Sequence, residues 1–185
     1  MKKLISVVTP SFNEEENIKE LCEAVSVELK KTNYDYEHII IDNSSTDNTI
    51  NILKDLAKKD KKLKLIINSR NFGHVRSPVH GLFQSKGDAA ILMMADFQDP
   101  IELIPKYIAE WEKGFEVVLG QKNSSDENFI KHFLKSLFYK FAKKISDSPL
   151  LMNTTGSGLI DRRVLEVLKS IDDPYPYFRG LIPEI

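Results

Sequence analysis

The 185-residue sequence contains a single cysteine, Cys22, so an intrachain disulfide and a cysteine-based metal site are both excluded. A reducing compartment is the natural setting for such a chain. Cys22 stands among Leu21, Val25 and Leu29 at helical spacing, and this apolar stripe predicts that it is buried. We therefore expect its thiol to be structural rather than nucleophilic.

An excess of charge of one sign and a long apolar run are also absent. The formal net charge is -1, which gives no overall attraction to nucleic acid. No apolar run reaches the roughly 20 residues of a membrane-spanning helix, and Met1-Lys2-Lys3 leads into an apolar segment rather than a signal peptide. We expect a soluble protein as the sequence stands, and its abrupt end at Ile185 leaves open that it is a fragment.

Several enzyme classes lack their signatures. No glycine-rich fingerprint follows the first apolar segment, which argues against a dinucleotide-binding dehydrogenase or a nucleotidyltransferase. No activated nucleophile supports a phosphatase or protease, and the histidines are too scattered for a triad or a metal cluster. His74 lies nearest to the loops discussed below, where we expect a loop histidine that is satisfied by its neighbours. The four histidines are His38, His74, His80 and His132.

Apolar strand patterns alternate with helical patterns, joined by short connections. Strands are expected at residues 4–9, 37–41, 63–67, 89–94, 115–119 and 153–160. Helices are expected at residues 13–29, 47–57, 75–85, 103–111 and 161–170, followed by an irregular tail at 172–183. The alternation predicts a single α/β domain over residues 1–185, with a mostly parallel sheet covered on both faces and right-handed crossovers. The polar loops then gather at one rim of the sheet.

The segment from Gly87 to Pro100 is the most informative of these. Its apolar run ends in Asp96, Gln98 and Asp99, whose oxygen atoms suit Mg²⁺ or Mn²⁺ carried by a diphosphate. We interpret it as a metal-diphosphate site. The alternative is an ordinary polar turn, in which Asp99 is the N-cap of a helix and Pro100 is in its first turn.

A basic amphipathic helix is expected at residues 129–145. Its apolar stripe allows packing on the core, whereas its lysines also allow binding to an anionic membrane surface. Both interpretations stay open.

Four segments, taken together and in order, resemble the motifs of inverting family-2 glycosyltransferases with the Rossmann-like GT-A fold. The resemblance extends from the first strand to about Arg163. The third and fourth segments are most similar to the polyprenyl-phosphate glycosyltransferases, including dolichol-phosphate mannosyltransferase-like enzymes. The four segments are residues 7–15, 41–49, 70–73 and 95–100.

This resemblance implies an enzyme that transfers a sugar with inversion from a UDP- or GDP-sugar to an acceptor, polyprenyl phosphate being one candidate. It implies Mg²⁺ or Mn²⁺ as cofactor, a role in cell wall or polysaccharide biosynthesis, and a cytoplasmic location that includes the cytoplasmic face of a membrane. The same resemblance assigns Asp96 as the catalytic residue and Asp96 with Gln98 as metal ligands. The implied substrate-binding residues are Pro10, Ser11, Phe12, Glu14, Asp42, Asn43, Arg70, Ala95 and Asp96.

Alternatives to these roles follow from the residues themselves. Phe12 could equally be a core aromatic, Asp42 a cap for the helix that starts near Asp47, and Arg70 an ordinary surface arginine.

Two departures from the family pattern concern acidic residues. Met94 stands where the first acid of an Asp-x-Asp motif is usual, and a thioether is a poor ligand for a hard cation. Gly156 stands where the polyprenyl-phosphate subgroup has an acidic base, and Gly158 where it has an arginine. A phosphate acceptor, with its second pKa near ~6, tolerates a missing base. A catalytically impaired homologue that binds nucleotide sugars or acts in assembly is the alternative.

Overall fold

The computed structural model describes residues 2–121, 154–171, 173–176 and 178–185. The basic amphipathic segment at 129–145 lies outside the described residues, so its helix stays a prediction. Within the described ranges, no helix combines the length and apolar character needed to cross a membrane.

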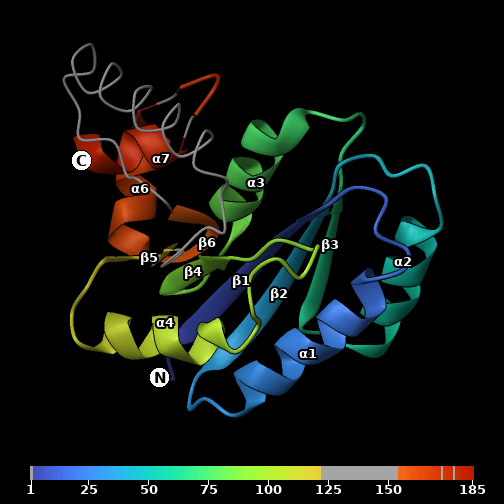
Figure 1. Cartoon of the computed structure of the whole chain (residues 1–185), viewed down its shortest axis with the longest axis horizontal. Coiled ribbons are helices and arrows are strands. Elements are labelled where there is room, and N and C mark those ends of the chain that lie inside the picture. Colours follow the sequence, from blue (N-terminus) through green and yellow to red (C-terminus); the bar gives the residue numbers. More distant parts are fainter. Residues whose placement is uncertain (1, 122–153, 172, 177) are drawn as a thin grey trace, which may run out of the picture.

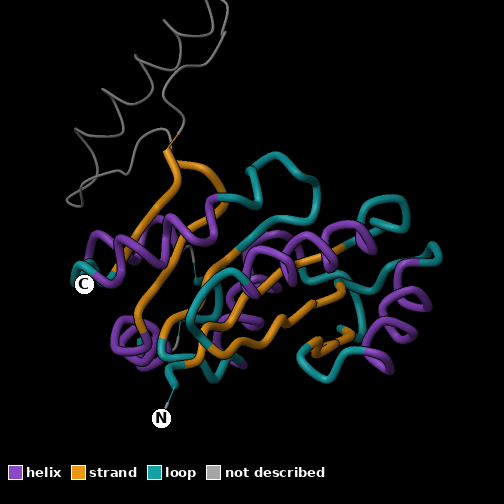
Figure 2. The backbone as a smooth tube through the Cα atoms, turned by 90° about the horizontal axis from the view of Figure 1, so that it is seen from below, coloured by secondary structure: helices purple, strands orange, loops and turns teal. Residues whose placement is uncertain are grey.

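Six described strands form one sheet in the order β3-β2-β1-β4-β6-β5 (Figures 1 and 2). Parallel pairing joins β1 to β2, β1 to β4 and β2 to β3, whereas β6 runs antiparallel to both β4 and β5. The predicted α/β class with a mostly parallel sheet is therefore confirmed. The strands are β1 (Leu4–Ser11), β2 (Asp35–Asp42), β3 (Leu63–Ile67), β4 (Ala89–Leu92), β5 (Val117–Gln121) and β6 (Thr154–Asp161).

Helices cover both faces of the sheet, because successive side chains of a buried strand point to opposite sides. In β1, Ile5 and Val7 pack in the layer that contains α1, α2 and α4, and Val8 packs in the layer that contains α3 and α6. Figure 1 shows these two groups of helices on opposite sides of the sheet. The helices are α1 (Ile18–Lys30), α2 (Thr49–Lys59), α3 (Gly73–Gln84), α4 (Leu103–Glu112), α6 (Arg162–Ser170), α7 (Phe178–Leu181) and the 3-10 helix η1 (Ile182–Glu184).

Buried ionisable groups inside this fold have structural roles. Burial raises the pKa of the Cys22 thiol to about 12, so the predicted buried structural thiol is confirmed. Burial also lowers the pKa of His38 to about 4, and its ring bonds the Thr9 hydroxyl at 3.0 Å. Neither group is poised to react near neutral pH.

The structure differs from the sequence-based expectations at the start of the first helix, at the Asp99 cap and in the tail. The first helix is expected to begin at residue 13, but Asn13 has a φ of 55° and its side chain accepts a hydrogen bond from the Thr46 backbone N–H, while α1 starts at Ile18. Asp99 does not cap α4, which begins at Leu103, because its carboxylate is buried against β6. The tail expected to be irregular contains α7 and η1.

Gly81 provides a test of the packing between α3 and the sheet. A Cβ at this position would lie 2.7 Å from Val8 Cγ1 and 3.0 Å from Ile41 Cγ2, both in stiff β-branched side chains. Gly81→Ala should therefore destabilise the protein by about 1–3 kcal/mol, although alanine has the higher helix propensity. Chemical denaturation would measure this loss against Gln84→Ala, an exposed position on the same helix. A stabilised Gly81→Ala variant would contradict the packing.

Candidate functional site

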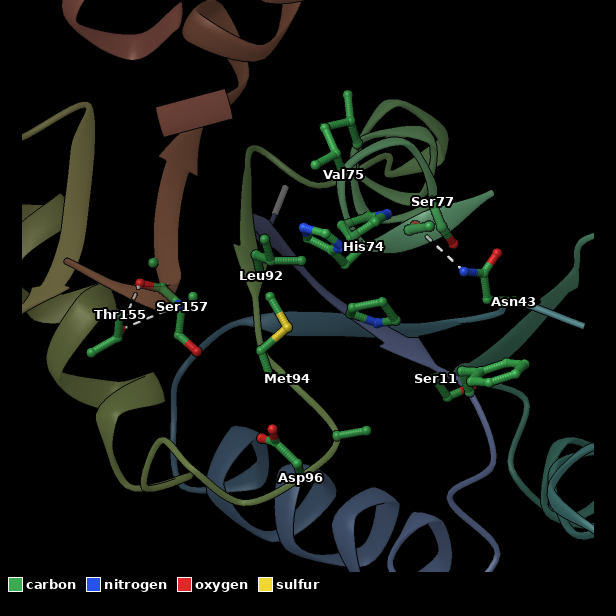
Figure 3. Close-up of a pocket in the computed structure, with 18 of the residues that line it drawn as sticks. Ser11, Asn43, His74, Val75, Ser77, Leu92, Met94, Asp96, Thr155 and Ser157 are labelled. Carbon is green, nitrogen blue, oxygen red and sulfur yellow. Dashed lines mark hydrogen bonds between the residues drawn. The ribbon is translucent and has the colours of Figure 1, made fainter. Parts of the chain in front are cut away.

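A pocket of about 720 Å³ lies where the carboxyl ends of β1 and β4 meet the start of α3 (Figure 3). Residues from the amino-terminal half of β6 complete its wall. Binding sites of open α/β sheets occupy this position, beyond the carboxyl ends of the parallel strands. The fold therefore places the polar loops identified in the sequence around one cavity.

Most of the predicted site residues meet at this pocket. Phe12 is 44% exposed in the wall, so the alternative of a core aromatic is wrong. Asp42, Arg70 and Gln98 are not among the described lining residues. The predicted residues that do line the pocket are Pro10, Ser11, Phe12, Glu14, Asn43, Ala95 and Asp96.

Asp42 braces the rim from within. It is fully buried at the end of β2, and its carboxylate accepts hydrogen bonds from the Ser45 backbone N–H at 2.9 Å, the Ser45 hydroxyl at 2.6 Å and the Ser11 hydroxyl at 3.2 Å. These bonds join the end of β1 to the loop after β2. In this structure Asp42 organises the rim rather than forming its surface.

Asn43 joins the same rim to the start of α3. Its Oδ1 accepts from the Phe72 backbone N–H at 2.9 Å and from Asn68 Nδ2 at 3.2 Å. Its Nδ2 donates to Asn71 Oδ1 at 2.8 Å and to the Gly73 carbonyl at 3.4 Å. Because both ends of the carboxamide are engaged, Asn43 positions the loop before α3 although it also lines the pocket.

Arg70 lies on the exposed surface beside this loop. Its guanidinium stacks over the Phe72 ring at 4.5 Å from the ring centroid. The stack is a cation–π contact, which leaves the guanidinium N–H groups free to donate to another group. Contact between Arg70 and a bound phosphate stays a prediction.

Asp96 is the acidic group at the strand end that the sequence singled out. It is exposed in the pocket, and its Oδ1 accepts a hydrogen bond from the Gln98 backbone N–H at 3.1 Å. In the described part of the chain, no group of three or more His, Cys, Asp or Glu side chains converges as a metal site. One carboxylate still fits Mg²⁺ or Mn²⁺ when a diphosphate and water supply the remaining oxygens.

Met94 and Gly156, the two departures from the expected acidic pattern, lie against each other. A Cβ at Gly156 would come within 2.9 Å of Met94 Cε and 3.1 Å of Met94 Cγ. Both residues line the pocket. The thioether therefore occupies the space above a glycine that has no side chain, and no sequence signal reveals this contact across 62 positions.

A buried polar contact under the pocket was also missed by sequence reasoning. The Ser157 hydroxyl, on β6, donates to Asp99 Oδ2 at 2.6 Å, and Asp99 is only 6% exposed. Burial, together with the nearby Asp99 carboxylate, raises the pKa of Tyr107 to about 12, so its phenol stays protonated. The Ser157–Asp99 bond ties the loop that carries Asp96 to the strand that carries Gly156.

Comparisons with known proteins identify a family and several relatives. A family model described as Glycosyl transferase family 2 matches residues 6–168. The chain is 34% identical over 178 residues to the putative glycosyltransferase CsbB of Bacillus subtilis, covering 96% of the chain and 54% of that protein. It is 33% identical over 179 residues to the bactoprenol glucosyl transferase of Shigella phage SfX, covering 96% of the chain and 59% of that protein. The chain thus spans little more than half of either relative.

Solved structures share the fold. S. aureus TarS 1-349 in complex with UDP-GlcNAc superimposes with a TM-score of 0.60 at 18% identity, over 99% of this chain and 53% of that one. The mannosyltransferase PcManGT from Pyrobaculum calidifontis, in complex with GDP-Man and Mn²⁺, also gives a TM-score of 0.60 at 18% identity, over 91% of this chain and 47% of that one. At such identities the likeness concerns architecture.

The Ser157–Asp99 bond can be tested by stability. Ser157→Ala should cost about 1–3 kcal/mol of unfolding free energy, because it removes the described hydrogen-bond donor to a buried carboxylate. Asp99→Asn should cost less, since its amide oxygen can still accept from Ser157. Thermal and denaturant unfolding would measure both, with Ser170→Ala on the exposed end of α6 as control. Equal stability of Ser157→Ala and the unsubstituted protein would show that the bond contributes little.

Proposed function

Because this chain belongs to glycosyl transferase family 2, we propose that it transfers a sugar with inversion from a nucleoside-diphosphate sugar to polyprenyl phosphate. The observation that carries the proposal is the pocket at the strand ends, where the exposed Phe12 ring and the Asp96 carboxylate line one cavity. The donor is a UDP- or GDP-sugar, since relatives of this fold are described with UDP-GlcNAc and with GDP-Man.

The donor occupies the side of the pocket formed by β1 and the loop after β4. Phe12 presents an exposed aromatic face on which a nucleoside base can stack. Glu14 and the Asn43 region border the same wall, where a ribose finds hydrogen-bonding groups. The diphosphate then extends toward Asp96.

Asp96 is the residue that would hold a divalent cation. Mg²⁺ or Mn²⁺ supplies neutralisation of the charge that develops on the leaving diphosphate. PcManGT is described with Mn²⁺, which supports divalent metal use in this fold. With Met94 in place of an acid, the protein contributes fewer oxygens than the family pattern has, and the affinity for the ion depends more on the bound diphosphate.

The acceptor reaches the sugar from the β6 side of the pocket. Apolar side chains line the pocket, and several relatives are described as bactoprenol glucosyl transferases, which supports a lipid acceptor. An acceptor phosphate oxygen attacks the anomeric carbon as the bond from that carbon to the diphosphate oxygen breaks and its electron pair leaves with the diphosphate. A phosphate monoester is largely ionised at pH 7, so its oxygen can attack without a general base. An acidic side chain at position 156, where this chain has glycine, is therefore not needed. The apolar residues are Val75, Val79, Leu92, Leu119, Ile160 and Ile182.

Nucleotide binding tests the donor assignment. UDP-sugars and GDP-sugars would each be titrated into the protein with and without Mn²⁺. One of the two kinds of nucleotide sugar should bind, and its affinity should be higher when Mn²⁺ is present. Asp96→Ala should reduce the metal-dependent gain by at least about tenfold, and Met94→Asp should increase it, because a carboxylate is the better ligand. Asp55→Ala, an exposed carboxylate on α2, is the matched control. Failure to bind any nucleotide sugar would defeat the proposal.

The acceptor assignment predicts a sharp preference between two lipids. A short-chain polyprenyl phosphate should be glycosylated, whereas the matching polyprenol should not, because its hydroxyl needs a base to remove the proton. A radiolabelled-sugar transfer assay at pH 7 would compare them. Equal transfer to both lipids would contradict the phosphate assignment, and nucleotide binding without transfer would favour the binding-protein alternative.

A further inference from the structure

The described wall of the pocket has more acidic than basic side chains, which is unusual for a site that binds a diphosphate. It contains the carboxylates of Glu14 and Asp96, and no lysine or arginine is among the described lining residues. A nucleoside diphosphate brings at least two further negative charges, and anionic phosphate groups are normally met by cationic side chains. Within the described wall, His74 is the side chain that can carry a positive charge.

His74 stands in the first turn of α3 and lines the pocket. Figure 3 shows it on the α3 side of the cavity, facing the strand end that carries Leu92 and Met94. Gly73, the residue before it, is held through its carbonyl by Asn43 at 3.4 Å. The anchored rim therefore fixes where the His74 backbone stands.

The His74 ring has no hydrogen-bond or ion-pair partner in the described part of the chain. That part comprises residues 2–121, 154–171, 173–176 and 178–185, and His74 is exposed within it. Arg70 and Arg76, which precede and follow His74 along the chain, stack over Phe72 and Tyr175, each at 4.5 Å, and neither is among the described lining residues. His74, by contrast, lines the pocket, and its ring nitrogens are available to a ligand.

We propose that His74 is a phosphate-binding residue of the pocket, whose ring N–H donates to a phosphate oxygen of the bound substrate. The inference rests on the proposed function and deepens it, since it names the protein group that meets the anionic part of the ligand. The phosphate belongs either to the leaving diphosphate of the donor or to the acceptor.

Two substitutions separate charge from shape. His74→Gln keeps a hydrogen-bonding side chain but removes a group that can carry a positive charge, whereas His74→Lys provides one. Calorimetry on the full chain would compare uridine with UDP, or guanosine with GDP, according to the base that the unsubstituted protein binds. His74→Gln should weaken the nucleoside diphosphate about tenfold and the nucleoside less than about twofold, and His74→Lys should retain most of the affinity. His80→Gln, an exposed histidine farther along α3, is the matched control.

The outcomes distinguish the source of the phosphate. An unchanged nucleoside diphosphate affinity with an about tenfold higher KM for short-chain polyprenyl phosphate would assign His74 to the acceptor. Equal loss of nucleoside and nucleoside diphosphate affinity, or no change in diphosphate affinity and acceptor KM, would overturn the inference while leaving the proposed function intact. If the unsubstituted protein bound no nucleotide, both proposals would fall.

Discussion

Two neighbouring side chains at the end of β2 hold the candidate site together. The Asp42 carboxylate bonds Ser11 and Ser45, and the Asn43 carboxamide bonds four groups on the segment that leads into α3. Both side chains are buried, so these bonds are shielded from water and each lost bond would leave a buried polar group without a partner. The wall of the pocket therefore depends on two residues whose polar groups are mostly engaged in hydrogen bonds within the protein.

Sequence periodicity was sufficient for the sheet and for the location of the site, because both follow from the alternation of strands and helices. The carboxyl ends of parallel strands share one edge of the sheet. The sequence alone therefore predicts that Phe12 and Asp96 lie at the same rim, and both line the pocket. Periodicity does not tell whether a polar residue at a strand end turns inward or outward, and Asp42 turns inward. Asp99 stands before a proline, which is the local pattern of a helix cap. Its hydrogen-bond partner is instead Ser157, 58 positions away, and no local pattern reveals such a contact.

The contact between Met94 and Gly156 changes how the missing acids are understood. In the sequence they are separate departures, one in the metal motif and one in the acceptor segment. In the fold one side chain fills the space that the other leaves, so the two positions form a single apolar part of the wall. An acid at position 156 would have to displace the thioether. The same wall is compatible with an acceptor that brings its own negative charge.

Strand β6 has a consequence for synthesis of the chain. It is the last of the six described strands to be translated, yet it lies between β4 and β5, pairing Leu92 with Gly158 and Val118 with Leu159. Until it emerges from the ribosome, each of its neighbours has an edge without hydrogen-bond partners, which is the kind of edge through which chains aggregate. The same eight residues close the sheet and supply part of the pocket wall. A nascent chain that stops before Thr154 thus has neither a finished sheet nor a finished binding site.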